Sequence, residues 1–211
     1  MSPSELLDLA ASAVIRPGLL GNTKIYGRAE TLFMAKSSEP GMKGGTACDV
    51  YFIRQARDGE TGFLAYVCDY KRGQQHYQVL STEAALCFTT TINGCTFSLG
   101  MPGGDGTLLV SHGNMAGDDM DPTDREALRD LDQTSRQKVI ANTFHGGSGQ
   151  FIDPSVYWGG GDRIDGGKVN VTVFGVRTDT GWHFYFQRFY VKSSVNYYVD
   201  LSDFRTQSVT F

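Results

Sequence analysis

Long apolar runs, clustered metal ligands and an excess of positive charge are all missing from this chain of 211 residues. No segment is long and apolar enough to span a bilayer as a helix. The formal net charge is −4, whereas proteins that bind nucleic acids gather lysine and arginine on one face. We therefore expect no nucleic-acid partner and no membrane partner. Met1–Glu5 has no positive charge of the kind that begins a signal peptide, so we expect none of the usual type.

Cysteine and histidine are scarce and scattered, with four of each. No CxxC or HxxxH spacing occurs, which argues against a structural zinc site, and we expect neither a metal nor a cofactor. A chain of this length can fill a core without disulfides. Cys48, Cys68 and Cys87 lie in apolar, strand-like runs and are expected to be small core residues.

The patterns along the chain predict one domain over residues 1–211 that combines helices with a mixed β-sheet. Residues 4–14 and 121–144 have helical spacing, and the second range opens with aspartate and proline. Residues 41–46 and 144–167 are expected to be loops. Strands are expected at 48–53, 63–68, 79–80, 85–91, 96–99, 107–111, 168–176, 182–192 and 195–201, the last of these at a sheet edge.

Cys95 is the first candidate for chemistry, because it follows Gly94 at a turn and His112 lies one predicted hairpin further along. A free cysteine with a pKa of about 8.5 is mostly protonated at neutral pH, so a nucleophilic thiol needs a neighbouring base. A hairpin between the two expected strands can bring the imidazole to the thiol. Backbone N–H groups around Gly94 can then hold an oxyanion.

A structural interpretation of the same residues stays open at this point. Free cysteine is among the most buried residue types, and His112 can simply end a strand. Cysteine–histidine pairs are defined by geometry rather than by local sequence, so the spacing alone does not choose between the two.

Three short motifs resemble the glutamine deamidase toxins of the Burkholderia lethal factor and cytotoxic necrotizing factor type. Ile92–Cys95 corresponds to the Leu-Ser-Gly-Cys motif that holds the nucleophile of that family, with Asn93 in place of the serine. Phe88–Thr89 precedes it at the spacing of the lethal factor branch. Gly104–Gly106 and then His112 follow, as in that branch, with a somewhat longer intervening segment.

The resemblance implies a mixed β-sheet sandwich flanked by helices and long loops, with Cys95 as nucleophile, His112 as base and Thr89 orienting the base or lining the site. Asn93, Gly94 and Tyr157 are the expected substrate-binding or oxyanion residues, Tyr157 because the glycine-rich segment 144–167 can wall the cleft. It also implies a monomeric bacterial effector that reaches the host cytosol and deamidates a glutamine of a host protein. Related toxins act on Rho-type GTPases or on a translation-initiation helicase.

Two other classes of function fit the same residues, one enzymatic and one not. A thioester on Cys95 can be resolved in a protease or a transglutaminase as well as in a deamidase. A binding module without enzymatic activity, with Cys95 buried and glycine-rich loops contacting a partner, belongs to a different class altogether.

Overall fold

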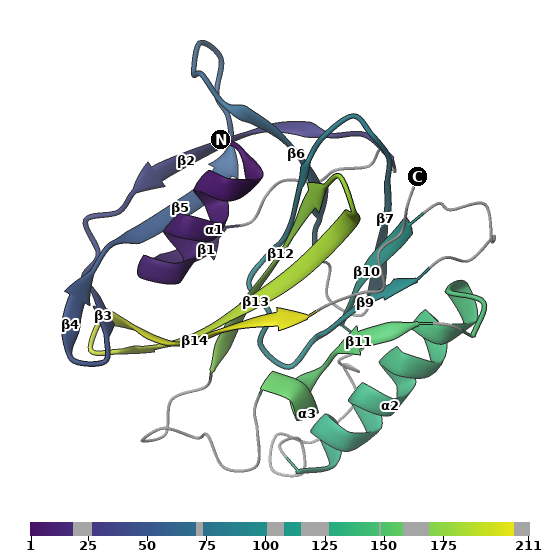
Figure 1. Cartoon of the computed structure of the whole chain (residues 1–211). Helices are drawn as coiled ribbons and strands as arrows, with labels where there is room; N and C mark the ends of the chain where they lie inside the picture. Colours follow the sequence, from purple (N-terminus) through teal and green to yellow (C-terminus); the bar gives the residue numbers. More distant parts are fainter. Residues whose placement is uncertain are drawn as a thin grey trace.

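Two β-sheets of unequal size form the body of the protein (Figure 1). The computed structural model describes residues 1–18, 27–70, 74–100, 108–114, 127–147, 149–157 and 169–204. The large sheet has ten strands in the order β1-β5-β2-β6-β8-β12-β13-β14-β3-β4, and the small sheet has four in the order β11-β9-β10-β7. The fold is therefore mixed α and β and consists mostly of sheet.

The elements have the following bounds. The helices are α1 (Pro3–Ser12), α2 (Ala127–Phe144) and α3 (Pro154–Tyr157). The strands are β1 (Val14–Pro17), β2 (Glu30–Lys36), β3 (Gly41–Lys43), β4 (Thr46–Cys48), β5 (Val50–Gln55), β6 (Phe63–Cys68), β7 (Gln74–Leu80), β8 (Leu86–Thr89), β9 (Thr96–Gly100), β10 (Leu108–Asn114), β11 (Gln150–Ile152), β12 (Asn170–Thr178), β13 (Gly181–Lys192) and β14 (Val195–Phe204).

Helix α1 begins where its sequence provides a cap. Ser2 accepts a hydrogen bond from the backbone N–H of Glu5, and the Glu5 carboxylate accepts one from the Ser2 N–H, which is a capping box. Leu6 and Ala10 lie on its buried face. The predicted helix at 4–14 is confirmed, except that it ends at Ser12 and Val14 already belongs to β1. Within the described part of the chain, no helix is apolar over a length that could cross a membrane.

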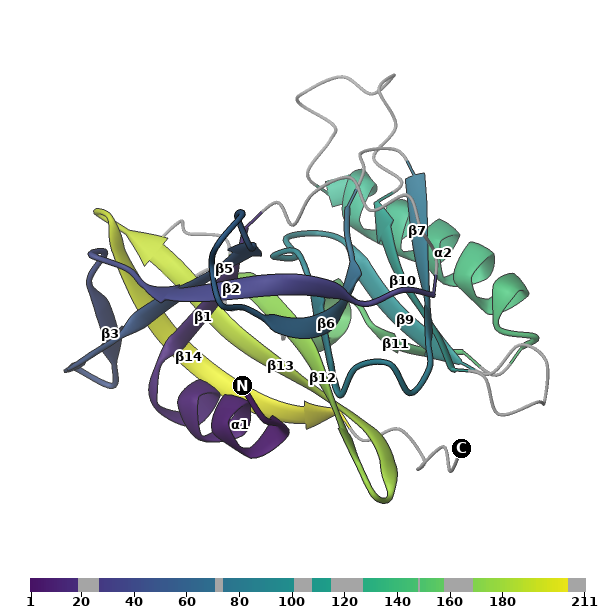
Figure 2. The ribbon, with the colours of Figure 1, turned by 90° about the horizontal axis from the view of Figure 1, so that it is seen from above.

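The central strand β12 of the large sheet is buried on both faces, because one face packs toward the small sheet and the other toward α1. In β12, Val171 and Val173 join the core between the two sheets, whereas Phe174 and Val176 join the core around α1. Burial on both faces explains why this strand is a nearly continuous apolar run. Figure 2 shows α2 outermost, beyond the small sheet.

The curl brings β1 back against β12 and β13, where side chains close the sheet instead of a backbone ladder. Gln187 accepts a hydrogen bond from the Ile15 N–H at 2.8 Å and donates to the carbonyls of Ala10 and Ala13 at 2.9 and 2.8 Å. Thr172 donates to the Ile15 carbonyl at 2.6 Å. We call these contacts the seam. The Gln187 amide thus accepts one hydrogen bond through its oxygen and donates two through its NH2 group.

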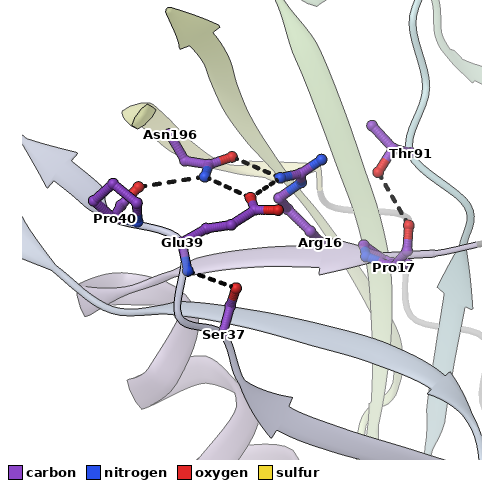
Figure 3. A network of polar contacts seen from close by, with 7 residues as sticks. All are labelled: Arg16, Pro17, Ser37, Glu39, Pro40, Thr91 and Asn196. Carbon is purple, nitrogen blue, oxygen red and sulfur yellow. Dashed lines mark hydrogen bonds and ion pairs between the residues drawn. The ribbon is translucent and has the colours of Figure 1, made fainter. Parts of the chain in front are cut away.

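A second set of polar contacts continues this closure toward β14 (Figure 3). Arg16 of β1 donates to Glu39 at 2.5 Å and to Asn196 at 3.0 Å, and Asn196 donates to the same Glu39 carboxylate at 3.0 Å. The Arg16 guanidinium also lies over the Phe52 and Phe189 rings. Arginine therefore joins two elements that are far apart in sequence, through both its charge and its flat face.

Each predicted strand overlaps an observed one, although the range 48–53 covers the end of β4 and most of β5, and β8 ends at Thr89. The assignment of these strands to a single continuing sheet is wrong. Strand β8 belongs to the large sheet, whereas β7, β9 and β10 form the small sheet with β11. The chain thus crosses between sheets over residues 90–95. The hairpins β9–β10 and β12–β13 are confirmed as antiparallel pairs.

Three predicted segments differ in detail. Residues 41–46 form the hairpin of β3 and β4 rather than a loop, and Gly44 and Gly45 supply the positive φ angles of its turn. Strand β14 is not an edge strand, because β3 pairs with it in parallel. The expected loop at 144–167 contains β11 and α3. The start of the second predicted helix, residues 121–126, lies outside the described residues.

We predict that Gln187→Leu lowers the free energy of unfolding by about 3 kcal/mol, because it leaves one buried backbone N–H and two carbonyls without their partner. Urea unfolding followed by circular dichroism measures the change. Gln55→Leu, at an exposed position of β5, is the control and should stay within about 0.5 kcal/mol of the wild type. Equal effects of the two substitutions would show that the seam does not hold the sheet closed.

Candidate functional site

The segment 90–95, which carries the candidate motif, is held at several points. Thr91 donates a side-chain hydrogen bond to the Pro17 carbonyl at 3.2 Å, next to the seam (Figure 3). Ile92 exchanges two backbone hydrogen bonds with Val171 of β12, at 2.7 and 2.8 Å. The crossing between the sheets is therefore a fixed corner.

Tyr157 clamps the turn that precedes the small sheet. Its hydroxyl accepts a hydrogen bond from the Gly94 N–H at 3.0 Å and donates to the Cys95 carbonyl at 2.7 Å. Gly94 has a φ of +84°, which a side chain would strain. Asn93 donates to the Asn170 side chain at 3.3 Å. Tyr157, expected on a cleft wall, is thus buried behind the loop, and the Gly94 N–H, expected to hold an oxyanion, is engaged with it.

Cys95 directly precedes β9, and it lies on the same face of the small sheet as His112 of the adjacent β10. His112 of β10 is directly opposite Phe97 of β9, and Cys95 is two residues before Phe97. Alternate residues of a strand share a face, so Cys95 is a diagonal neighbour of His112, with Cα atoms about 7 to 8 Å apart in such pairs. Both side chains are buried, with 4% and 1% of their surface exposed. Neither imidazole nitrogen is hydrogen-bonded to the Cys95 thiol.

The His112 ring is buried, and its surroundings keep it neutral. Burial is the main cause that lowers its pKa, to about 3; the nearby His76 also lowers it, and the Cys68 backbone opposes the shift. Tyr70 packs beside the ring, with centroids 5.5 Å apart. Among the described residues, the Nε2 atom of His112 has no hydrogen-bond partner. A neutral imidazole with a free ring nitrogen can accept a proton.

The structure brings Thr90, rather than Thr89, to the imidazole. The Thr90 hydroxyl is 3.5 Å from Nδ1 of His112, at the limit of a hydrogen bond. The Thr89 hydroxyl instead donates to the Thr90 carbonyl at 2.8 Å. Successive side chains of a strand point to opposite faces, so a shift of one residue decides which threonine meets the histidine.

The four cysteines are free thiols in different surroundings. Cys68 and Cys87 are buried, and burial raises the pKa of each above the usual value. Cys48 is expected to be a core residue, but it is only half-buried. The sulfur of Cys95 accepts a hydrogen bond from Asn114 Nδ2 at 3.2 Å. Asn114 escaped the sequence analysis, although it lies two residues after His112 and so on the same strand face.

The opposite face of the small sheet carries a buried polar network beneath α2. Ser98 of β9 is hydrogen-bonded to Ser111 of β10 and, at 3.0 Å, to Nε2 of His145. Burial lowers the pKa of His145 to about 4. A side chain at Gly100 would collide with the His145 ring, so the end of α2 sits close against the sheet. This network fixes the helix and lies on the other side of the sheet from Cys95.

Comparison of the sequence with protein-family models and with curated proteins finds no match. Within the described residues, no three histidine, cysteine, aspartate or glutamate side chains converge as metal ligands. The chemistry on the inner face of the small sheet is that of a thiol, a neutral imidazole and a carboxamide donor.

We predict that Tyr157→Phe lowers the free energy of unfolding by about 1 to 3 kcal/mol, because the Gly94 N–H and the Cys95 carbonyl both lose the hydroxyl. Tyr190→Phe is the control, since the Tyr190 ring stacks on Tyr197 at a half-buried position and keeps that contact. Thermal unfolding compares the two. An equal, small effect of both would contradict the clamp.

We predict a pH dependence of stability that comes from His112. Its pKa in the folded state, about 3, lies below its usual 6.5, so on acidification through this range only the unfolded chain takes up the proton. Stability should therefore fall as the pH falls below about 6.5. His112→Gln removes this contribution to the pH dependence. Between pH 7 and pH 4.5, the free energy of unfolding of the wild type should therefore fall by about 2 to 3 kcal/mol more than that of the variant.

Urea unfolding at several pH values measures this difference in slope. His183→Gln, which removes an imidazole from a half-buried position in a hairpin, is the control. Parallel slopes for wild type and His112→Gln would mean that the imidazole is not kept neutral by its surroundings.

Proposed function

We propose that the protein is a cysteine-dependent protein glutamine deamidase, with Cys95 as nucleophile and His112 as general base. The observation that carries this proposal is the register of β9 and β10. It sets a thiol and a neutral imidazole on one face of adjacent strands, with an amide N–H directed at the sulfur. A nucleophile with a base on a neighbouring strand is the arrangement that covalent acyl transfer requires.

The reaction follows from these groups. His112 takes the proton of the Cys95 thiol, and the sulfur attacks the carboxamide carbon of a glutamine. The C–N bond breaks, and ammonia leaves with the proton that His112 returns. Water then gives a proton to His112 and hydrolyses the thioester, which restores the thiol. Glutamine and water are thus converted into glutamate and ammonia.

The resemblance to the deamidase toxins supports the choice of glutamine over other amides. Ile92–Cys95 and His112 are the positions that match the motifs of that family. Two sheets packed together with helices are compatible with the mixed sandwich that the resemblance implies. Thr90 takes the place proposed for Thr89 beside the imidazole. By this analogy the substrate is a host protein, a Rho-type GTPase or a translation-initiation helicase, which gains a negative charge where it had a neutral amide.

Access to the thiol is a requirement of this proposal. With 4% of its surface exposed, Cys95 must be uncovered before a glutamine side chain can reach it. The same burial favours a second candidate, a binding module in which Cys95 and His112 are core residues. Alkylation with iodoacetamide at neutral pH separates the deamidase from the binding module. A thiol that becomes exposed and ionises reacts much faster than Cys68 or Cys87.

We predict that wild-type protein, but not Cys95→Ser, converts a glutamine of a host-cell lysate protein to glutamate, a mass gain of about one unit with release of ammonia. Peptide mapping by mass spectrometry identifies the glutamine. Cys48→Ser is the control, since it removes a half-buried thiol from β4 and should leave the activity within about twofold. Circular dichroism verifies that each variant is folded.

Other products would redirect the proposal. A cleaved substrate would indicate a protease, and an added amine in the presence of an amine donor would indicate a transglutaminase. No change in any lysate protein, together with a thiol as inert as Cys87, would leave the binding module as the better account.

A further inference from the structure

Asn114 is the residue whose side chain touches the candidate nucleophile. Its Nδ2 atom lies 3.2 Å from the Cys95 sulfur, and both side chains are buried. Asn114 ends β10 and is paired with Gln74 of β7, so the sheet holds its backbone on the side away from Cys95. A buried amide fixed in this way keeps its donor directed at the sulfur without further ordering.

The buried thiols of this protein differ in the direction of their hydrogen bonds. The Cys68 sulfur donates to the His76 carbonyl at 3.7 Å, which needs the thiol proton. The Cys95 sulfur accepts from an amide N–H, which becomes a stronger, charge-assisted bond when the sulfur is ionised. Hydrogen bonding to the charged form favours that form, whereas burial alone opposes it.

One backbone N–H of the turn is engaged away from the sulfur. The Gly94 N–H is directed at the Tyr157 hydroxyl. On β10, His112 and Asn114 are two residues apart and share the face that looks toward Cys95. The strand β10 thus carries both a proton acceptor, His112, and a hydrogen-bond donor for the thiolate, Asn114.

We propose that Asn114 is a catalytic residue that activates Cys95: its side-chain N–H stabilises the thiolate that attacks the substrate amide. This inference rests on the proposed function, but its test does not use turnover. Asn114 contacts the reacting atom itself, and the ionisation of that atom can be measured in the protein without a substrate.

The test is the pH midpoint of Cys95 ionisation, taken from thiolate ultraviolet absorbance as the difference between each protein and the same protein with Cys95→Ser. Asn114→Asp is nearly isosteric and places a carboxylate against the sulfur, so the midpoint should rise by about two units. Asn114→Ala removes the donor, and its midpoint should rise by about one unit, a tenfold smaller thiolate fraction near neutral pH.

Asn170→Asp is the matched control. Asn170 lies beside the same loop through its contact with Asn93, and an aspartate there keeps an accepting oxygen while adding the same charge against the Asn93 side chain instead of the sulfur. Its midpoint should stay within about half a unit of the wild type. Thermal unfolding verifies each fold, and Asn114→Ser replaces any Asn114 variant that does not fold, with the rise expected for alanine.

Three results would overturn the inference: an unchanged midpoint in Asn114→Asp and Asn114→Ala, an equal rise in Asn170→Asp, or a wild-type midpoint above the value of about 8.5 for a free cysteine. The two proposals can fail separately. A low midpoint that depends on Asn114, without glutamine conversion, keeps the activated thiol and rejects deamidation. Glutamine conversion with a midpoint independent of Asn114 does the reverse.

Discussion

One buried amide closes the large sheet of this protein. Gln187 satisfies the N–H of Ile15 and the carbonyls of Ala10 and Ala13, all at a place where β1 meets β13 without a regular ladder. An open edge of this kind would leave backbone groups unpaired in the core, which is expensive in free energy. Because the amide supplies both donor and acceptor, α1 can sit inside the curl of the sheet while the sheet keeps an apolar face on each side.

The seam and the candidate site are parts of one connected structure. Thr172 contacts Ile15 at the seam, and its neighbour in β12, Val171, holds Ile92. Thr91 reaches the end of β1 at Pro17. The corner that carries Cys95 therefore rests on the same strands that close the sheet. A site built on such rigid elements keeps its groups aligned, whereas a free loop would not.

The sequence predicts the helices and strands of this chain better than it predicts which strands pair with one another. Residues 182–192 are rich in aromatic residues and alternate in the way that favours a strand, and Ser2 and Glu5 define the start of α1. Alternation does not tell which sheet a strand joins, so the separation of β8 from β9 and the internal place of β14 could not be foreseen. These depend on contacts between distant residues.

The same distinction holds at the site. The neighbourhood of Cys95 and His112 follows from a local hairpin and could be predicted, whereas the clamp by Tyr157 joins residues some sixty positions apart. Burial makes the site informative about chemistry: it disfavours an ionised thiol and a charged imidazole alike. A thiol kept in such a place as a nucleophile needs a donor of its own, and a thiol kept there for packing does not. On the proposed function, the amide of Asn114 supplies that donor to Cys95, whereas the sulfur of Cys68 faces a carbonyl instead.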